Sequence, residues 1–189
     1  MQITEQQHRA ADEIIELIAS KLGDNRAIHP GTAISSCARL AGSFLFRSFK
    51  FSMKDISPGT AVLSTEANEK GLVLINILGL TLSSLEVNID SNKLNELPKG
   101  ETKLDFLDAL NLLQGKAVGI MNGQGLNFEL MAYSCTMATA FLIKECQRDL
   151  AVESGFNTAI YGFIEGCKTC PPELSNSVKK KNGFFSFWK

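Results

Sequence analysis

The sequence predicts an all-α fold, a single-domain bundle of about six helices, and three observations carry this prediction. Apolar residues recur every three to four positions through most of the 189 residues, which is the period of an amphipathic helix. Residues that cap helices stand before several of these periodic segments, and glycines stand after them. No segment alternates apolar and polar residues with the period of two that a half-buried strand needs.

The first helix is expected over residues 4–22. Thr4 and Gln7 have the spacing of a capping box, in which each side chain bonds the backbone N–H of the other residue, and Gly23 ends the segment. From the apolar periodicity, further helices are expected over residues 31–50, 62–86, 103–121, 127–148 and 156–166. Residues 88–102 are expected to form a long polar connector, and residues 122–125 a tight turn.

The helix over residues 127–148 is expected to be the central one. It is apolar on nearly all sides over most of its length, which is the pattern of a helix that other helices surround. Glycine costs about 1 kcal/mol relative to alanine inside a helix. Gly42, Gly79 and Gly162 therefore indicate places where a neighbouring helix packs closely or where the helix kinks.

The phrase Pro-Gly-Thr-Ala occurs twice, at residues 30–33 and 58–61, and predicts the start of a helix both times. Proline keeps the residue before it out of the helix, and Thr32 or Thr60 can act as the N-cap. The first N–H groups of a helix can also bind an anion, although a plain helix cap is the simpler interpretation. The candidate anion-binding residues are His29, Gly31 and Thr32.

Five cysteines stand among mostly apolar neighbours, which is typical of reduced thiols in a cytoplasmic protein. Cys167 and Cys170 form a Cys-x-x-Cys pair, but the pair follows a helix, where the helix dipole disfavours a thiolate. A structural zinc site needs four ligands. The others would have to come from separate helices: Cys37, Cys135, Cys146, His8 and His29. No metal, cofactor or catalytic residue is therefore predicted, and a redox or zinc role for the pair is the alternative.

The helix expected over residues 31–50 has a polar stripe that Phe46 interrupts. An aromatic residue flanked by two arginines, Arg39 and Arg47, and by small hydroxyl residues is typical of a surface that binds a protein partner. These three residues form one candidate binding surface. The alternatives are a single exposed phenylalanine or a helix that is buried on both sides.

The C-terminal end differs most from an average globular sequence, so the chain divides into a helical domain over residues 1–170 and a basic, aromatic tail over residues 171–189. The last six residues hold four of the fifteen aromatic residues: Phe184, Phe185, Phe187 and Trp188. We expect these rings to fill a groove on this or a second copy of the chain, or to bind another protein. The alternative is a weak contact with an anionic membrane surface.

Composition excludes some classes of function. The chain has a formal net charge of −1, with 44% hydrophobic and 21% charged residues, so it lacks the basic excess that nucleic-acid binding needs. Its N-terminus lacks the features of a signal peptide, and we expect a cytoplasmic protein. The sequence predicts a helical binding or scaffold protein that acts through protein contacts, as a homodimer or within a complex. The alternative is a protein or enzyme that binds an anionic small molecule at His29, Gly31 and Thr32.

Overall fold

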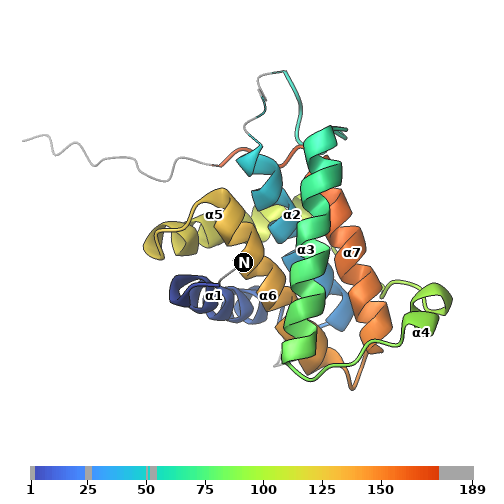
Figure 1. Ribbon diagram of the computed structural model, residues 1–189. Coiled ribbons are helices and arrows are strands. Elements are labelled where there is room, and N and C mark those ends of the chain that lie inside the picture. The colour runs from blue at the N-terminus through green and yellow to red at the C-terminus, as the bar shows by residue number, and fades with distance from the viewer. Residues whose placement is uncertain (1–2, 24–26, 50, 52–54, 175–189) are drawn as a thin grey trace, which may run out of the picture.

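The computed structural model describes residues 3–23, 27–49, 51 and 55–174, and over these residues the protein is all-α. Its helices are α1 (Glu5–Leu22), α2 (Pro30–Ser48), α3 (Thr65–Ser84), α4 (Ser91–Glu96), α5 (Phe106–Gly123), α6 (Phe128–Cys146) and α7 (Val152–Lys168) (Figure 1). All six expected helices are present, with ends within four residues of the expected ones. The predicted fold class is therefore confirmed.

The connector expected over residues 88–102 contains the short helix α4, which corrects the sequence prediction. The Asp90 side chain caps this helix by accepting a hydrogen bond from Asn92 N at 3.0 Å. α7 holds α4 in place, because Asn157 Nδ2 donates to the carbonyls of Leu94 and Leu97 at 3.0 and 2.7 Å. A helix of six residues is too short to show an apolar period, so the sequence pattern could not reveal it.

Two helices, not one, form the centre of the bundle. α6 is buried along most of its length, as expected, but α2 is buried without a break from Gly31 to Phe46. α2 packs against α1, α3, α5, α6 and α7. The polar stripe expected on α2 therefore lies inside the protein, where Ser35 and Ser43 donate to backbone carbonyls of their own helix. Among the described residues no single helix has the length and composition to cross a membrane; α5 and α6 meet that criterion only as a pair, and the chain bends by 113° between them.

Small residues allow α2 and α7 to pack backbone against backbone. A Cβ atom on Gly42 would lie 2.7 Å from the Cα atom of Gly166. A Cβ atom on Gly162 would lie 2.7 Å from the Cβ atom of Ala38. The close packing predicted at Gly42 and Gly162 is therefore confirmed. Gly79 differs, because a Cβ atom there would meet nothing within 4 Å.

The second Pro-Gly-Thr-Ala phrase forms a turn and does not begin a helix, contrary to the sequence prediction. A hydrogen bond of 3.1 Å closes the turn over residues 57–60, and Gly59 has a φ of +87°, as the third residue of a type II turn requires. The backbone of residues 59–62 then pairs antiparallel with residues 168–170. Lys168 is the last residue of α7, and the other two residues follow it. α3 begins later, with Ser64 as its N-cap.

Candidate functional site

The N-terminus of α2 is capped by His29, whereas the sequence predicted Thr32 in that role. His29 Nδ1 accepts a hydrogen bond from Thr32 N at 3.3 Å and lies 3.0 Å from Thr32 Oγ1. Thr32 Oγ1 accepts a hydrogen bond from Lys103 N at 2.9 Å, so its own proton is free to be donated to Nδ1. A ring whose Nδ1 accepts in this way carries its proton on Nε2. His29 and Thr32 thus fasten the loop before α5 to the start of α2.

The backbone expected to bind an anion at this N-terminus is covered by the protein itself. Thr32 N is bonded to His29, and a Cβ atom on Gly31 would lie only 2.0 Å from the carbonyl oxygen of Glu101. A cavity of about 620 Å³ lies beside the cap. Its lining includes the basic side chains of Lys21 and Lys103 and the ring of His29, whose Nε2–H can donate a hydrogen bond. An anion in this cavity would therefore meet these side chains and not the N–H of Thr32.

The Cys-x-x-Cys pair lies at the C-terminal end of α7, as expected, and both thiols are buried. Burial raises the pKa of Cys167 to about 12, and Lys168 opposes this only in part. Burial also raises the pKa of Cys170, whose Sγ donates to the carbonyl of Ile56 at 3.5 Å. Both thiols are therefore protonated at neutral pH and are poor nucleophiles. All five cysteines are free, and the described residues include no group of three or more His, Cys, Asp or Glu side chains placed to hold a metal ion.

Phe46 and Arg39 lie inside the protein, which corrects the exposed surface expected for them. Phe46 is 1% exposed, and its ring packs against the rings of Phe49 and Phe51. Arg39 is also buried; its Nε donates to Glu165 Oε2 at 2.6 Å, and its Nη1 donates to a backbone carbonyl before α5 at 2.6 Å. Arg39 therefore joins α2 to α7 and to the segment before α5, whereas the Phe46 ring packs against residues that directly follow its own helix.

Arg47 holds the segment that follows α7. It is half-buried at the end of α2, and burial lowers the pKa of its guanidinium group. Its Nη2 donates to Gln114 Oε1 at 3.0 Å and to the carbonyl of Pro172. Gln114 Nε2 in turn donates to the carbonyl of Glu173 at 3.5 Å, so α2 and α5 together fix the chain near Leu174, the last described residue. The other candidate contacts, Phe184, Phe185, Phe187 and Trp188, lie outside the described residues.

A groove that the sequence did not predict runs between α3 and α7. Its cavity has a volume of about 190 Å³. The lining residues are Ala67, Asn68, Gly71, Leu72, Ile75, Phe163, Ile164, Cys167 and Lys168. Leu72 is 60% exposed and Ile164 is 46% exposed, so the apolar walls of the groove face water. Gly71 leaves the groove open, because a Cβ atom there would meet nothing within 4 Å.

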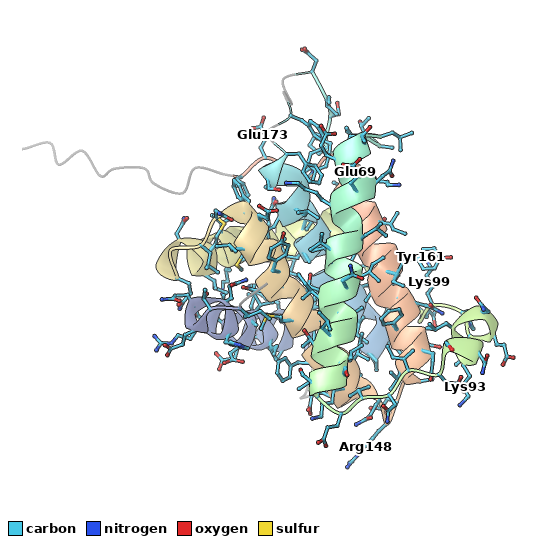
Figure 2. The ribbon with its side chains drawn as sticks, viewed as in Figure 1. Glu69, Lys93, Lys99, Arg148, Tyr161 and Glu173 are labelled. Carbon is cyan, nitrogen blue, oxygen red and sulfur yellow. The ribbon has the colours of Figure 1, made fainter. Side chains whose placement is uncertain are left out.

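The surface beside the groove is also partly apolar. Tyr161 lies one helical turn before Ile164 on α7 and is exposed. Figure 2 shows Tyr161 next to Lys99, whose Nζ lies 4.9 Å from the centre of the tyrosine ring. The sequence signal for this apolar surface was the composition of α3, whose apolar residues cover more than one face of the helix. That composition does not say which apolar residues stay exposed.

Comparisons of the chain with protein-family models, with curated proteins and with solved structures found no match. The chemistry of the protein therefore has to be inferred from its own residues. The buried thiols are held protonated, and Arg39, Arg47 and His29 hold helices and loops together. The groove between α3 and α7 differs from these groups, because no described residue covers its exposed apolar walls. It is the candidate functional site.

Proposed function

We propose that the protein is a cytoplasmic helical binding protein, and that the groove between α3 and α7 receives an aromatic or aliphatic side chain from a polypeptide segment. The observation that carries the proposal is the groove itself, a cavity of about 190 Å³ whose walls include the exposed side chains of Leu72 and Ile164. Exposed apolar surface of this kind, when it flanks a hollow, marks a contact site more often than a scattered exposed residue does.

The size of the groove suits one ring. An engineered protein cavity of roughly 150 Å³ is large enough to hold benzene, and this groove is somewhat larger. Burial of an aromatic side chain is favourable by about 1.5–3 kcal/mol when the ring leaves water completely. A single seated ring is therefore an anchor of modest strength, and the rest of the affinity would come from contacts around it.

Charge favours a basic segment as the occupant. The whole chain has a formal net charge of −1, and residues 175–189 contain four lysines and no acidic residue, so residues 1–174 carry −5. A negative net charge attracts a basic segment and speeds its encounter with the surface, and salt screens this attraction. Figure 2 shows Glu69 on α3 and Glu173 near the last described residues, at the same end of the bundle.

Photo-cross-linking tests this function. Leu72 is replaced by the photoreactive residue p-benzoylphenylalanine in the full chain, and Leu63, which is 83% exposed and does not line the groove, is replaced in the matched control. Irradiation in the expressing cell should give a covalent adduct to a polypeptide at position 72 and little at position 63. Mass spectrometry of the adduct identifies the segment, whether it belongs to this chain, a second copy or another protein. Equal yields at both positions would contradict the proposed function.

A second candidate function is the binding of a small anion in the cavity beside His29. The observation in its favour is the convergence of Lys21, His29 and Lys103 on a cavity of about 620 Å³. Isothermal titration with inorganic phosphate tests it. Binding that weakens when Lys21 and Lys103 are both replaced by alanine supports the site, and absence of binding contradicts it.

A further inference from the structure

We propose that the segment that occupies the groove between α3 and α7 is the C-terminal segment of the same chain, residues 175–189, with Trp188 among the rings that it brings there. This inference rests on the proposed function, because it names the occupant of that site. The segment carries four of the fifteen aromatic residues of the chain, including its one tryptophan. An aromatic ring that stays in water does not gain the favourable free energy of burial, so four rings in one short segment favour a docked segment.

The described chain ends where such a contact can begin. Arg47 and Gln114 hold the carbonyls of Pro172 and Glu173. Figure 1 shows this end of the chain at the same end of the bundle as the start of α3 and the end of α7. The groove lies toward that end, because it is lined by residues of the first half of α3 and of the second half of α7.

The segment is long enough to reach the groove. Phe184 follows Leu174 by ten residues, and ten residues of extended chain span about 33–36 Å. α3 has 20 residues and is therefore about 30 Å long. The span of the spacer thus exceeds the length of α3, and the groove opens near the second turn of that helix, at Gly71.

The chemistry of the segment matches the groove and its surroundings. The walls are apolar, and Lys168 at the rim can lie over the face of a seated ring as a cation–π partner. The four lysines of residues 175–189 give it a charge of +4 against −5 for the rest of the chain. Because the segment is tethered, its effective concentration at the groove is on the order of millimolar. One ring by itself does not fill the groove at that concentration, so the neighbouring rings and the lysines of the segment have to add to its affinity, and an outside segment has to displace them.

Fluorescence of Trp188 tests the inference in the full chain, since this is the only tryptophan. Gly71→Leu fills the groove, and Gly79→Leu is the matched control. Both glycines lie on α3, and a Cβ atom on either would meet nothing within 4 Å, but only Gly71 lines the groove. Replacing glycine by leucine favours a helix, so Gly79→Leu should unfold at no lower urea concentration than the native chain, and both variants should keep the helical circular dichroism of the native chain.

The expected result is a blue-shifted Trp188 emission in the native chain and in the control variant Gly79→Leu. In Gly71→Leu the emission should shift to the red, to that of a tryptophan exposed to water. The emission should not change with protein concentration. The inference is overturned if the native chain shows the emission of water-exposed tryptophan. It is also overturned if both variants keep the blue shift or both lose it. A blue shift that appears only with anionic vesicles, or that grows with protein concentration, overturns it as well. A cross-link from position 72 to another polypeptide would, in each of those cases, leave the proposed function standing.

Discussion

Replacement of Gly42 by alanine should destabilise the protein although alanine is the better helix former. A Cβ atom at this position would lie 2.7 Å from the Cα atom of Gly166, 2.7 Å from the carbonyl oxygen of Phe163 and 2.9 Å from the backbone N of Cys167. All three atoms belong to the backbone of α7, so no side-chain rotation can relieve the contact. The added methyl group has to push α2 and α7 apart along the interface.

The size of the effect follows from two opposing terms. Overpacking of a dense core costs about 1–3 kcal/mol, and contacts with backbone atoms place this site at the upper end. Removal of a glycine from a helix interior returns about 1 kcal/mol. The free energy of unfolding of Gly42→Ala should therefore fall by about 2 kcal/mol. At Gly79 a Cβ atom meets nothing within 4 Å, so only the gain from removing a glycine applies. Gly79→Ala should therefore raise the free energy of unfolding by about 0.5–1 kcal/mol.

Urea unfolding followed by circular dichroism measures both variants under the same conditions. The two should differ by about 3 kcal/mol, with opposite signs relative to the native chain. The double variant Gly42→Ala, Gly166→Ala should cost less than the sum of its single variants, since the helices have to separate only once. A Gly42→Ala protein as stable as the native chain would refute the proposed backbone contact between α2 and α7.

Three further predictions concern a helix cap, an ion pair and the cysteine thiols. His29→Ala should lower the free energy of unfolding by about 1 kcal/mol in urea, because it removes the N-cap of α2. Glu165→Gln should lower it by about 2 kcal/mol in the same assay: it leaves the buried charge of Arg39 without its partner, and partial exposure of Glu165 keeps the cost below the 3–5 kcal/mol of a fully buried pair. Stability should fall as the pH rises from about 9 toward about 12, because burial raises the pKa of Cys37 and of Cys167 to about 12 while unfolded thiols lose their protons near 9. Unfolding curves at pH 8 and pH 10 measure this fall, which should become smaller in Cys167→Ala.

Local signals in the sequence were sufficient to place the long helices. The capping box of Thr4 and Gln7 forms as predicted, with Gln7 N donating to Thr4 Oγ1 at 3.3 Å and Thr4 N to Gln7 Oε1 at 3.1 Å. Such interactions lie within one helical turn, so they depend on neighbouring residues alone. The same reasoning failed for the second Pro-Gly-Thr-Ala phrase, and at the first phrase, which does begin α2, it predicted Thr32 as the cap where the structure has His29. Their outcome depends on distant partners: Lys103 N and Glu101 at the first, and the backbone of residues 168–170 at the second.

The polar stripe on α2 shows why burial is harder to predict than helix position. Serine can satisfy its hydroxyl by donating to a carbonyl of its own helix, as Ser35 and Ser43 do. A helix rich in serine can therefore enter the core with most of its hydroxyl groups paired, although the buried Ser36 Oγ has no hydrogen-bond partner among the described residues. Arg39 enters with it because α7 supplies Glu165 from 126 residues away. No local pattern contains that partner, so the exposed surface predicted around Phe46 and Arg39 was wrong.

The groove could not be predicted for a related reason, and it bears on the C-terminal segment. A hollow at Gly71 arises only because α3 and α7 pack with Phe163, Ile164 and Cys167 opposite the first half of α3. Within the described residues the exposed walls of the groove are apolar surface without a ring to cover them. The sequence beyond Leu174 supplies rings. The groove walls and the aromatic rings each cost free energy when their apolar surface is left in water. Contact between the rings and the groove would remove both costs. The proposed docking of residues 175–189 uses the same hydrophobic term that packs the core, and it predicts that a groove filled at Gly71 releases the segment.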